Sequence, residues 1–325
     1  TTLETYDRGQ FVHDCIAGAT VALVALPLSI AIAIASGAPP AAGLVTAVVG
    51  GLVVSALGGS RVQIGGPTGA FIVVVYGIVA RHGLAGLQLA TLMAGVILVI
   101  GGLLRAGRLI QLIPEAVIDF FTIGIAVVIA TSQLKDLSGL TNGALPADFL
   151  PKIEGLWAAR GSADWSSLLL GLAAIVGILL VRRFAPQFRA RAVVVLATSA
   201  LALALPSVAT VASHFGTLPH GLSMPHLPPM SWPLVVDLAP AAITIALLAG
   251  IESLLSAPVA DRMIGGYHRT NAELLAQGVA NIASPLFGGP AGVLAAGLSE
   301  AASGRAAAVV PDGFNCAALS ASVPT

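Results

Sequence analysis

The most restrictive feature of this sequence is a polar break, Gly65–Phe71, set within long apolar runs. The break reads Gly-Gly-Pro-Thr-Gly-Ala-Phe, and an apolar stretch to Tyr76 follows it. Glycine and proline interrupt a helix that arrives from the N-terminal side, whereas proline is well tolerated at the first position of a departing helix. The break therefore predicts a half-helix that begins at Pro67 and ends near Gly83.

The first residues of such a half-helix have a distinct chemistry. Amides near Thr68, Gly69 and Ala70 would lack acceptors within the helix and would lie at the positive end of its dipole. The glycines let a ligand approach the backbone closely, so a terminus of this kind binds anions. Many secondary transporters build their mid-membrane substrate site from paired half-helices. We therefore predict an anion site at Thr68–Phe71.

A similar glycine- and proline-containing motif recurs late in the chain as Gly288–Val293, which reads Gly-Gly-Pro-Ala-Gly-Val. The second glycines of the two breaks lie 223 residues apart (289 − 66), and the same offset places Asp14 on Asp237, each heading an apolar run. Two repeats with paired helix breaks are typical of transporters. A second half-helix is predicted to begin at Pro290, and the residues predicted to contact the anion there are Gly289, Pro290 and Ala291.

Composition indicates a protein that lies in a lipid bilayer. Hydrophobic residues make up 57% of the 325 residues and charged residues only 9%, whereas a soluble domain has about 25% charged residues. The net charge of zero argues against nucleic acid as a partner. Two cysteines are too few for a cysteine-rich metal site, and no enzyme motif is evident. We expect no catalytic residue, no metal site and no cofactor.

Apolar runs of roughly 20 residues, enough to cross a bilayer, divide the chain. The predicted parts are a cytoplasmic lead-in at 1–14, a first membrane repeat at 15–211, an extracytoplasmic loop at 212–236 and the start of a second repeat at 237–325. A short surface helix is predicted over 151–160. The second repeat holds 89 residues (325 − 236), so we expect it to be incomplete.

Basic residues indicate how the spans are oriented. With the N-terminus in the cytoplasm, ten arginines fall in inner segments and four basic residues in outer segments, a clear positive-inside bias. Seven predicted crossings precede Asp237, so the second repeat starts from the opposite side. The two repeats are therefore inverted, and their half-helices are predicted to oppose one another.

This orientation predicts a labelling pattern. Cysteines introduced at 182–191 should react with a membrane-impermeant thiol reagent only from the cytoplasmic side, because four arginines gather there. Cysteines introduced around His220 should react only from outside. The reverse pattern would overturn the inverted alignment.

One acidic residue interrupts the eighth predicted span, 237–259. Glu252 lies fifteen residues after Asp237, and the span holds no Lys or Arg to pair with it. A charge near mid-membrane costs at least about 2.5–3.5 kcal/mol, so such residues usually face a cavity and have a function. Ser256 lies one turn later on the same face. We predict that Glu252 and Ser256 bind the coupling ion; a purely structural, protonated Glu252 is the alternative.

The ninth predicted span, 271–284, carries its own row of polar residues. Glu273, Gln277 and Asn281 recur at intervals of four residues and therefore share one helix face. Polar side chains of this kind commonly join membrane helices through hydrogen bonds. We predict that this row connects helices and does not contact the substrate.

Several stretches resemble the SulP family of anion transporters, the sulfate-permease type. They are Pro27–Ala33, Gly65–Phe71, Ile113–Gly124, Ser132–Leu137 and Ala276–Gly289, within a resemblance that covers roughly residues 8–290. The resemblance implies an all-α polytopic membrane protein with inverted seven-segment repeats, two opposed half-helices, and core and gate domains. After Gly289 the sequence departs from the family pattern, and no STAS domain is recognised in this chain.

The resemblance also implies a site between the third and tenth helices, bordered by the first and eighth. By position it points to Pro27, Ser29, Thr68, Gly69, Ala70, Glu252 and Ser256. We predict an alternating-access transporter in the inner (plasma) membrane that moves a dicarboxylate, sulfate or bicarbonate together with H⁺. A Na⁺/bicarbonate symporter and an uncoupled exchanger or channel of the same fold remain alternatives. The expected partners are the small anion, membrane lipid and, in the full-length protein, a second copy of the chain.

Overall fold

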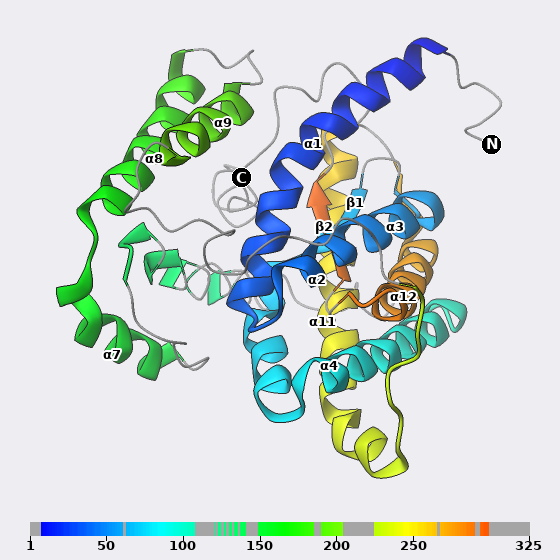
Figure 1. Cartoon of the computed structure of the whole chain (residues 1–325). Coiled ribbons are helices and arrows are strands. Elements are labelled where there is room, and N and C mark those ends of the chain that lie inside the picture. The colour runs from blue at the N-terminus through cyan, green and yellow to red at the C-terminus, as the bar shows by residue number, and fades with distance from the viewer. Residues whose placement is uncertain are drawn as a thin grey trace. The chain divides into compact units, whose positions relative to one another are not determined.

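The computed structural model describes most of the chain, in two compact units (Figure 1). Unit 1 combines Thr1–Thr122 with Pro219–Thr325, and unit 2 is Ile123–Leu218. Apart from one two-stranded sheet, the regular structure of the described residues is helical. The described residues are 8–60, 63–107, 120, 123–124, 127, 130–131, 133–135, 137–140, 149–184, 190–203, 224–264, 267–289 and 293–298.

Unit 1 is built mainly from long apolar helices, as Figure 1 shows. Its elements in chain order are α1 (Arg8–Ala35), α2 (Pro40–Val45), the π-helix η2 (Thr46–Gly50), α3 (Gly51–Leu57), β1 (Gln63–Pro67), the 3₁₀-helix η3 (Gly69–Phe71), α4 (Ile72–Leu103), α11 (Trp232–Ile264), α12 (Thr270–Leu286) and β2 (Val293–Leu298). Among its described residues, three segments of this unit are long and apolar enough to cross a membrane: Pro40–Leu57, Ile72–Leu103 and Trp232–Leu254.

The predicted spans agree with these helices, with shifted ends. The eighth and ninth predicted spans coincide with α11 and α12, although α11 begins at Trp232, before residue 237. Helix α1 begins at Arg8, so the predicted lead-in at 1–14 is partly helical. Residues 185–189 and the loop around His220 lie outside the described residues, so labelling remains the test of orientation.

Helix α4 changes direction at Gly83, which has φ +67° and ψ −171°. Only glycine adopts this backbone conformation readily, because a Cβ would clash with the neighbouring peptide groups. The bend separates residues 72–82 from the longer segment 84–103 and confirms the predicted end of the half-helix.

The two sequence breaks meet in the antiparallel sheet formed by β1 and β2. The pairs are Gln63 with Leu298, Ile64 with Gly297, Gly66 with Leu294 and Pro67 with Val293, and the register shifts between Ile64 and Gly66. The strand that leads into the first break thus pairs with the strand that follows the second break.

This sheet corrects two predictions about the breaks. Pro67 is the last residue of β1, and the helix begins after it, at Gly69 as a 3₁₀ turn and at Ile72 as an α-helix. After the second break the described chain is a strand, Val293–Leu298, where the half-helix was predicted. Each strand satisfies the other's N–H and C=O groups, which are costly to leave unpaired away from water.

Helices α11 and α12 pack along α4 through small residues. A Cβ built at Gly278 would lie 2.7 Å from the backbone N of Val99 and 2.8 Å from the carbonyl O of Gly95. Small residues at such crossings let membrane helices approach backbone to backbone. Almost fully buried side chains fill the contacts on both sides of α4: Leu87, Leu89, Ala90, Leu238, Ile245, Leu274 and Ala276.

Unit 2 contains α7 (Phe149–Ala159), the 3₁₀-helix η4 (Arg160–Ser162), α8 (Trp165–Phe184) and α9 (Ala190–Leu203). Helix α7 confirms the predicted surface helix, and the pair Phe149–Ser162 and Trp165–Val181 is bent by 115°. Asp164 caps α8 at this bend, accepting from the Ser167 hydroxyl at 2.8 Å and from the Ser167 amide at 3.0 Å. These bonds lower the pKa of the Asp164 carboxyl, because they favour its charged form.

Candidate functional site

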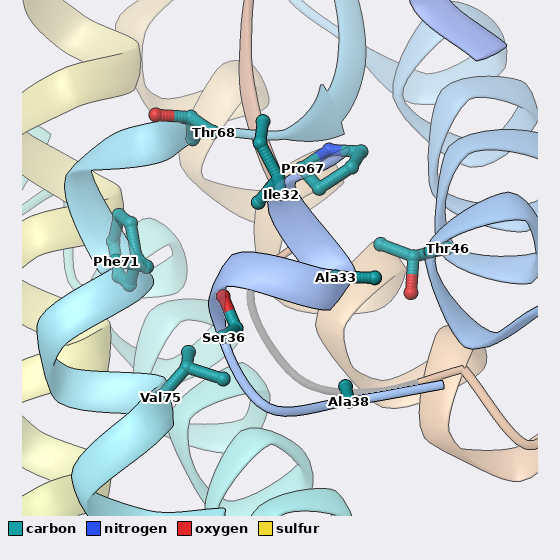
Figure 2. A pocket seen from close by; sticks show the side chains of 10 residues that line it. Ile32, Ala33, Ser36, Ala38, Thr46, Pro67, Thr68, Phe71 and Val75 are labelled. Carbon is teal, nitrogen blue, oxygen red and sulfur yellow. The ribbon is translucent and has the colours of Figure 1, made fainter. Parts of the chain in front are cut away.

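The start of the half-helix forms one wall of a small pocket in unit 1 (Figure 2). Ser36, Thr46 and Thr68 are the residues of the lining with polar side chains, and the other lining residues are apolar. The pocket volume is about 10 Å³, the room of about one water molecule, so an anion of sulfate size enters only when the walls move apart. The lining residues are Ile32, Ala33, Ser36, Ala38, Gly43, Thr46, Pro67, Thr68, Phe71 and Val75.

A short hydrogen bond connects this pocket to the intramembrane acid. The hydroxyl Oγ1 of Thr68 donates to Oε1 of Glu252 at 2.7 Å, across 184 residues of sequence. The second oxygen, Oε2, is buried and has no hydrogen-bond partner among the described residues. Holding a charged carboxylate in such a place is costly unless donors or a cation serve it. The structure therefore brings together the predicted anion site and the predicted coupling residue.

The helix start itself retains the predicted character. The amides of Gly69 and Ala70 open the 3₁₀ turn that leads into α4, whereas the Phe71 amide donates to the Thr68 carbonyl O at 3.4 Å. The Phe71 side chain is almost fully buried and closes the pocket on one side. The first two amides of the turn therefore lie at the positive end of the helix dipole, next to the pocket.

Two other predicted residues lie on α1, outside the pocket lining. Pro27 is exposed, and Ser29 is buried with its hydroxyl donating to the Ala25 carbonyl O at 2.6 Å. Helix α1 instead lines the pocket with Ile32 and Ala33, about one turn further along, and Ser36 follows directly after the helix. The sequence analysis did not predict Ser36 as a site residue. The one feature of the sequence that could have indicated it is its position just before the turn at Gly37.

The second break approaches the pocket from the opposite side, at Thr46. Ser284 Oγ donates to Thr46 Oγ1 at 3.2 Å, and a Cβ built at Gly289 would lie 2.9 Å from Thr46 Oγ1. The predicted residue Gly289 is buried here, and its amide donates to the Ser284 carbonyl O at 3.0 Å. Pro290 and Ala291 lie outside the described residues.

Ser256, the second residue predicted to bind the coupling ion, lies in α11, one turn after Glu252, but its side chain is not among those described. Sequence reasoning also missed Thr46. No local sequence pattern identifies it. In the structure Thr46 is the first residue of the π-helix η2, which lies between α2 and α3. Short π-helical segments are frequent at functional sites.

Glu273 and Gln277 of the polar row connect α12 to other elements, as predicted, whereas Asn281 Nδ2 donates to the Gln277 carbonyl O within α12 at 2.9 Å. Glu273 is fully buried, and its Oε2 accepts from the Gly59 amide at 2.9 Å while its Oε1 accepts from Ser253 Oγ at 3.2 Å. Gln277 Nε2 donates to both Ser253 Oγ and Glu273 Oε1 at 3.4 Å. Two adjacent residues of α11 therefore have different partners: Ser253 contacts α12, and Glu252 contacts Thr68.

Adding bulk at the helix start is expected to weaken anion binding. Leucine in place of Gly69 would cover the first amides, and losing a charge-assisted hydrogen bond worth about 1.5–3 kcal/mol reduces affinity by about tenfold or more. Equilibrium binding of labelled sulfate to purified protein measures the loss. Gly77→Leu is the matched control, because no described atom lies within 4 Å of a Cβ built there. Equal affinity of wild type and Gly69→Leu would place the anion elsewhere.

Comparison with known proteins agrees with the family resemblance seen in the sequence and with the fold. The model of the Sulfate permease family matches residues 11–305 and continues past residue 290, where the resemblance in the sequence ended. A Bacillus subtilis protein named "Putative sulfate transporter YvdB" is 40% identical over 286 residues, which cover 87% of this chain and 54% of that protein. The bicarbonate transporter BicA of Picosynechococcus is 30% identical, over 86% of this chain and 51% of that protein.

The chain spans about half the length of these curated relatives. Among solved structures, the transmembrane domain of a cyanobacterial BicA matches with a TM-score of 0.75 and 27% identity, over 97% of this chain and 81% of that chain. The inward-facing murine Slc26a9 anion transporter, 17% identical, shares the fold with a TM-score of 0.77, over 97% of this chain and 56% of that chain. These matches confirm an all-α membrane fold of transporters, not of enzymes. The chain belongs to the sulfate permease family.

Proposed function

We propose that this protein is a secondary active transporter that moves a small anion across the inner (plasma) membrane together with H⁺. The anion binds beside the helix start at Thr68–Phe71, and Glu252 carries the coupled proton. The observation that supports this assignment is the 2.7 Å hydrogen bond between Thr68 Oγ1 and Glu252 Oε1, which joins the two sites.

Electrostatics couples the two ions. The helix start attracts an anion through its amides and dipole. An ionised Glu252 next to it repels the same anion, since two like charges about 4 Å apart at an effective dielectric constant of about 20 interact by about 4 kcal/mol. Protonation of Glu252 removes the repulsion. Proton and anion therefore bind together, and a proton gradient can drive the anion.

The pocket implies that transport needs a change of conformation. With a volume of about 10 Å³ it is too small for a hydrated or bare sulfate ion. We assign unit 1, which holds the pocket, to the core domain, and unit 2 to the gate domain. Alternating access then exposes the pocket to one side of the membrane at a time.

Two anions are favoured by the relatives. Sulfate is named for the Bacillus subtilis relative with 40% identity. Bicarbonate is named for the Picosynechococcus BicA, which is 30% identical, and for a cyanobacterial BicA whose transmembrane domain matches the fold with a TM-score of 0.75. The BicA match favours bicarbonate as the second candidate substrate, and Na⁺ is the alternative coupling ion for it.

Uptake into proteoliposomes tests the proposal. Purified protein is reconstituted, and uptake of labelled sulfate, bicarbonate and fumarate is followed with an inward pH gradient, an inward Na⁺ gradient or none. We expect an acidic exterior to accelerate uptake of one anion and a protonophore to abolish the acceleration. Protein-free liposomes set the background. Flux at background for all three anions would refute the transporter assignment, and acceleration by Na⁺ alone would favour the second candidate.

A further inference from the structure

The hydrogen bond between Thr68 and Glu252 uses a donor that an anion would also need. A threonine hydroxyl has a single hydrogen to donate, whereas its oxygen can accept twice. In this structure Thr68 donates that hydrogen to Glu252 Oε1 at 2.7 Å. Figure 2 shows the hydroxyl turned toward α11 and away from Ser36 and Thr46, although the residue lines the pocket.

The direction of this bond depends on the proton of Glu252. An ionised carboxylate only accepts hydrogen bonds, so Thr68 must be the donor while Glu252 is charged. A protonated carboxyl has an O–H donor of its own and can donate it to Thr68 Oγ1. The Thr68 hydrogen can then turn to another acceptor by rotation about the Cβ–Oγ1 bond, while Oγ1 stays in place and accepts from Glu252.

We infer that Thr68 couples proton binding to anion binding by changing its hydrogen-bond acceptor. It donates to Glu252 when that residue is ionised and to the anion when that residue is protonated. This inference rests on the proposed function of the same site. It adds a geometric switch to the electrostatic repulsion, because the charged form of Glu252 both repels the anion and withholds one of its donors.

The surroundings of the pair favour such a switch. Phe71, Val75 and Ile32 form apolar walls of the pocket, and hydrogen bonds are stronger in a low-dielectric interior than in water. Glu252 Oε2 has no partner in the described part of the chain. The carboxyl proton of Glu252 therefore has few polar groups other than Thr68 to which it can be donated. An anion in the pocket is bound more tightly for each hydrogen-bond donor that turns toward it.

The other titratable groups on the elements packed against α11 either bond to residues other than Glu252 or lie far from it. On α12, Glu273 is held by the Gly59 amide and Ser253. On α4, His82 lies 3.5 Å from Asp237 of α11, which is fifteen residues, or about 22 Å of helix, from Glu252. Also on α4, Tyr76 packs near Gly37, and Arg81 is exposed at the far end of the half-helix. Strand β2 carries no titratable residue.

Binding of labelled sulfate at two pH values tests the switch. Sulfate keeps its two charges at both, so its own titration does not contribute. Thr68→Val keeps the shape but removes the hydroxyl. If Thr68 changes acceptor as inferred, Thr68→Val should weaken sulfate binding about tenfold or more at the acidic pH, which favours the protonated form of Glu252, and less than about twofold at the alkaline pH, which favours the ionised form. Thr68→Ser, which keeps a donor, should resemble the wild type at both.

The same substitution made in a Glu252→Gln variant distinguishes the change of hydrogen-bond acceptor from simple charge repulsion. In Glu252→Gln the residue no longer titrates, so the effect of Thr68→Val should become the same at both pH values. Thermal unfolding of each variant confirms that it is folded. An equal loss at both pH values with Glu252 intact, or no loss at either, would overturn the inference while leaving the proposed function standing. Absence of sulfate binding by the wild type would overturn sulfate as the ligand and this inference with it.

Discussion

Replacing Glu252 with glutamine is expected to abolish pH-driven anion accumulation while leaving anion exchange in place. Glutamine keeps the shape of the protonated acid and still offers a hydrogen-bond partner to Thr68, which lies 2.7 Å from the carboxylate in the wild type. It cannot release a proton, however. The anion then still binds, but its movement is no longer tied to that of H⁺.

The size of the effect follows from the coupling. Consider a transport cycle that moves one proton with each anion and carries no net charge. Each unit of the pH gradient then supplies about 1.36 kcal/mol, enough for about tenfold accumulation of the anion. Glu252→Gln should reduce this ratio to about one at every imposed gradient. Accumulation in proteoliposomes measures it, and exchange of internal for external labelled anion, without a gradient, shows that the site is intact.

Asp237→Asn is the matched control for this experiment. It removes a carboxylate from the same helix, α11, but its side chain is 65% exposed and it lies fifteen residues from Glu252. It should keep driven uptake near the wild-type level. Driven uptake at the wild-type level in Glu252→Gln would remove Glu252 from the mechanism and favour a structural role. Loss of a sodium-driven flux, with no response to pH, would instead assign Glu252 to a Na⁺ site.

Gly278→Leu is expected to destabilise the protein severely. The added side chain would begin 2.7 Å from the Val99 backbone N and 2.8 Å from the Gly95 carbonyl O. Overpacking in a core costs about 1–3 kcal/mol, and occasionally more. The upper end applies here, because backbone atoms of α4 cannot move aside by changing a rotamer. Thermal unfolding in detergent should show a clear fall in Tm and poor recovery of folded protein.

Alanine substitutions at Gly77 and Gly278 test the same helix contact with a smaller side chain. Gly77 is also within α4, but no described atom lies within 4 Å of a Cβ built there. Gly77→Ala should raise the free energy of unfolding by about 0.5–1 kcal/mol, the usual gain from replacing glycine in a helix. Gly278→Ala should lower it. Equal changes in the two variants would show that α4 and α12 are not in backbone contact.

The sequence alone predicted much of the local architecture, because the signals were local. Long apolar runs with few charges require helices in lipid, and α11 and α12 lie where two such runs predicted them. The Gly65–Phe71 break identified the start of the half-helix to within a few residues. The lone acid within an apolar span identified Glu252, and the spacing of Glu273, Gln277 and Asn281 predicted the row that joins helices.

Contacts between distant segments were decided by the tertiary structure. Strand pairing of β1 with β2 overrode the helical preference predicted at Pro67 and over 293–298, since each strand satisfies backbone groups that the other leaves unpaired. Local propensity cannot reveal a partner more than two hundred residues away. The same holds for Thr46, which contacts Ser284 across 238 residues, and for Thr68, which meets Glu252 across 184. The sequence thus determined which residues carry charge and where helices break, and only the packing decided which of them share one pocket.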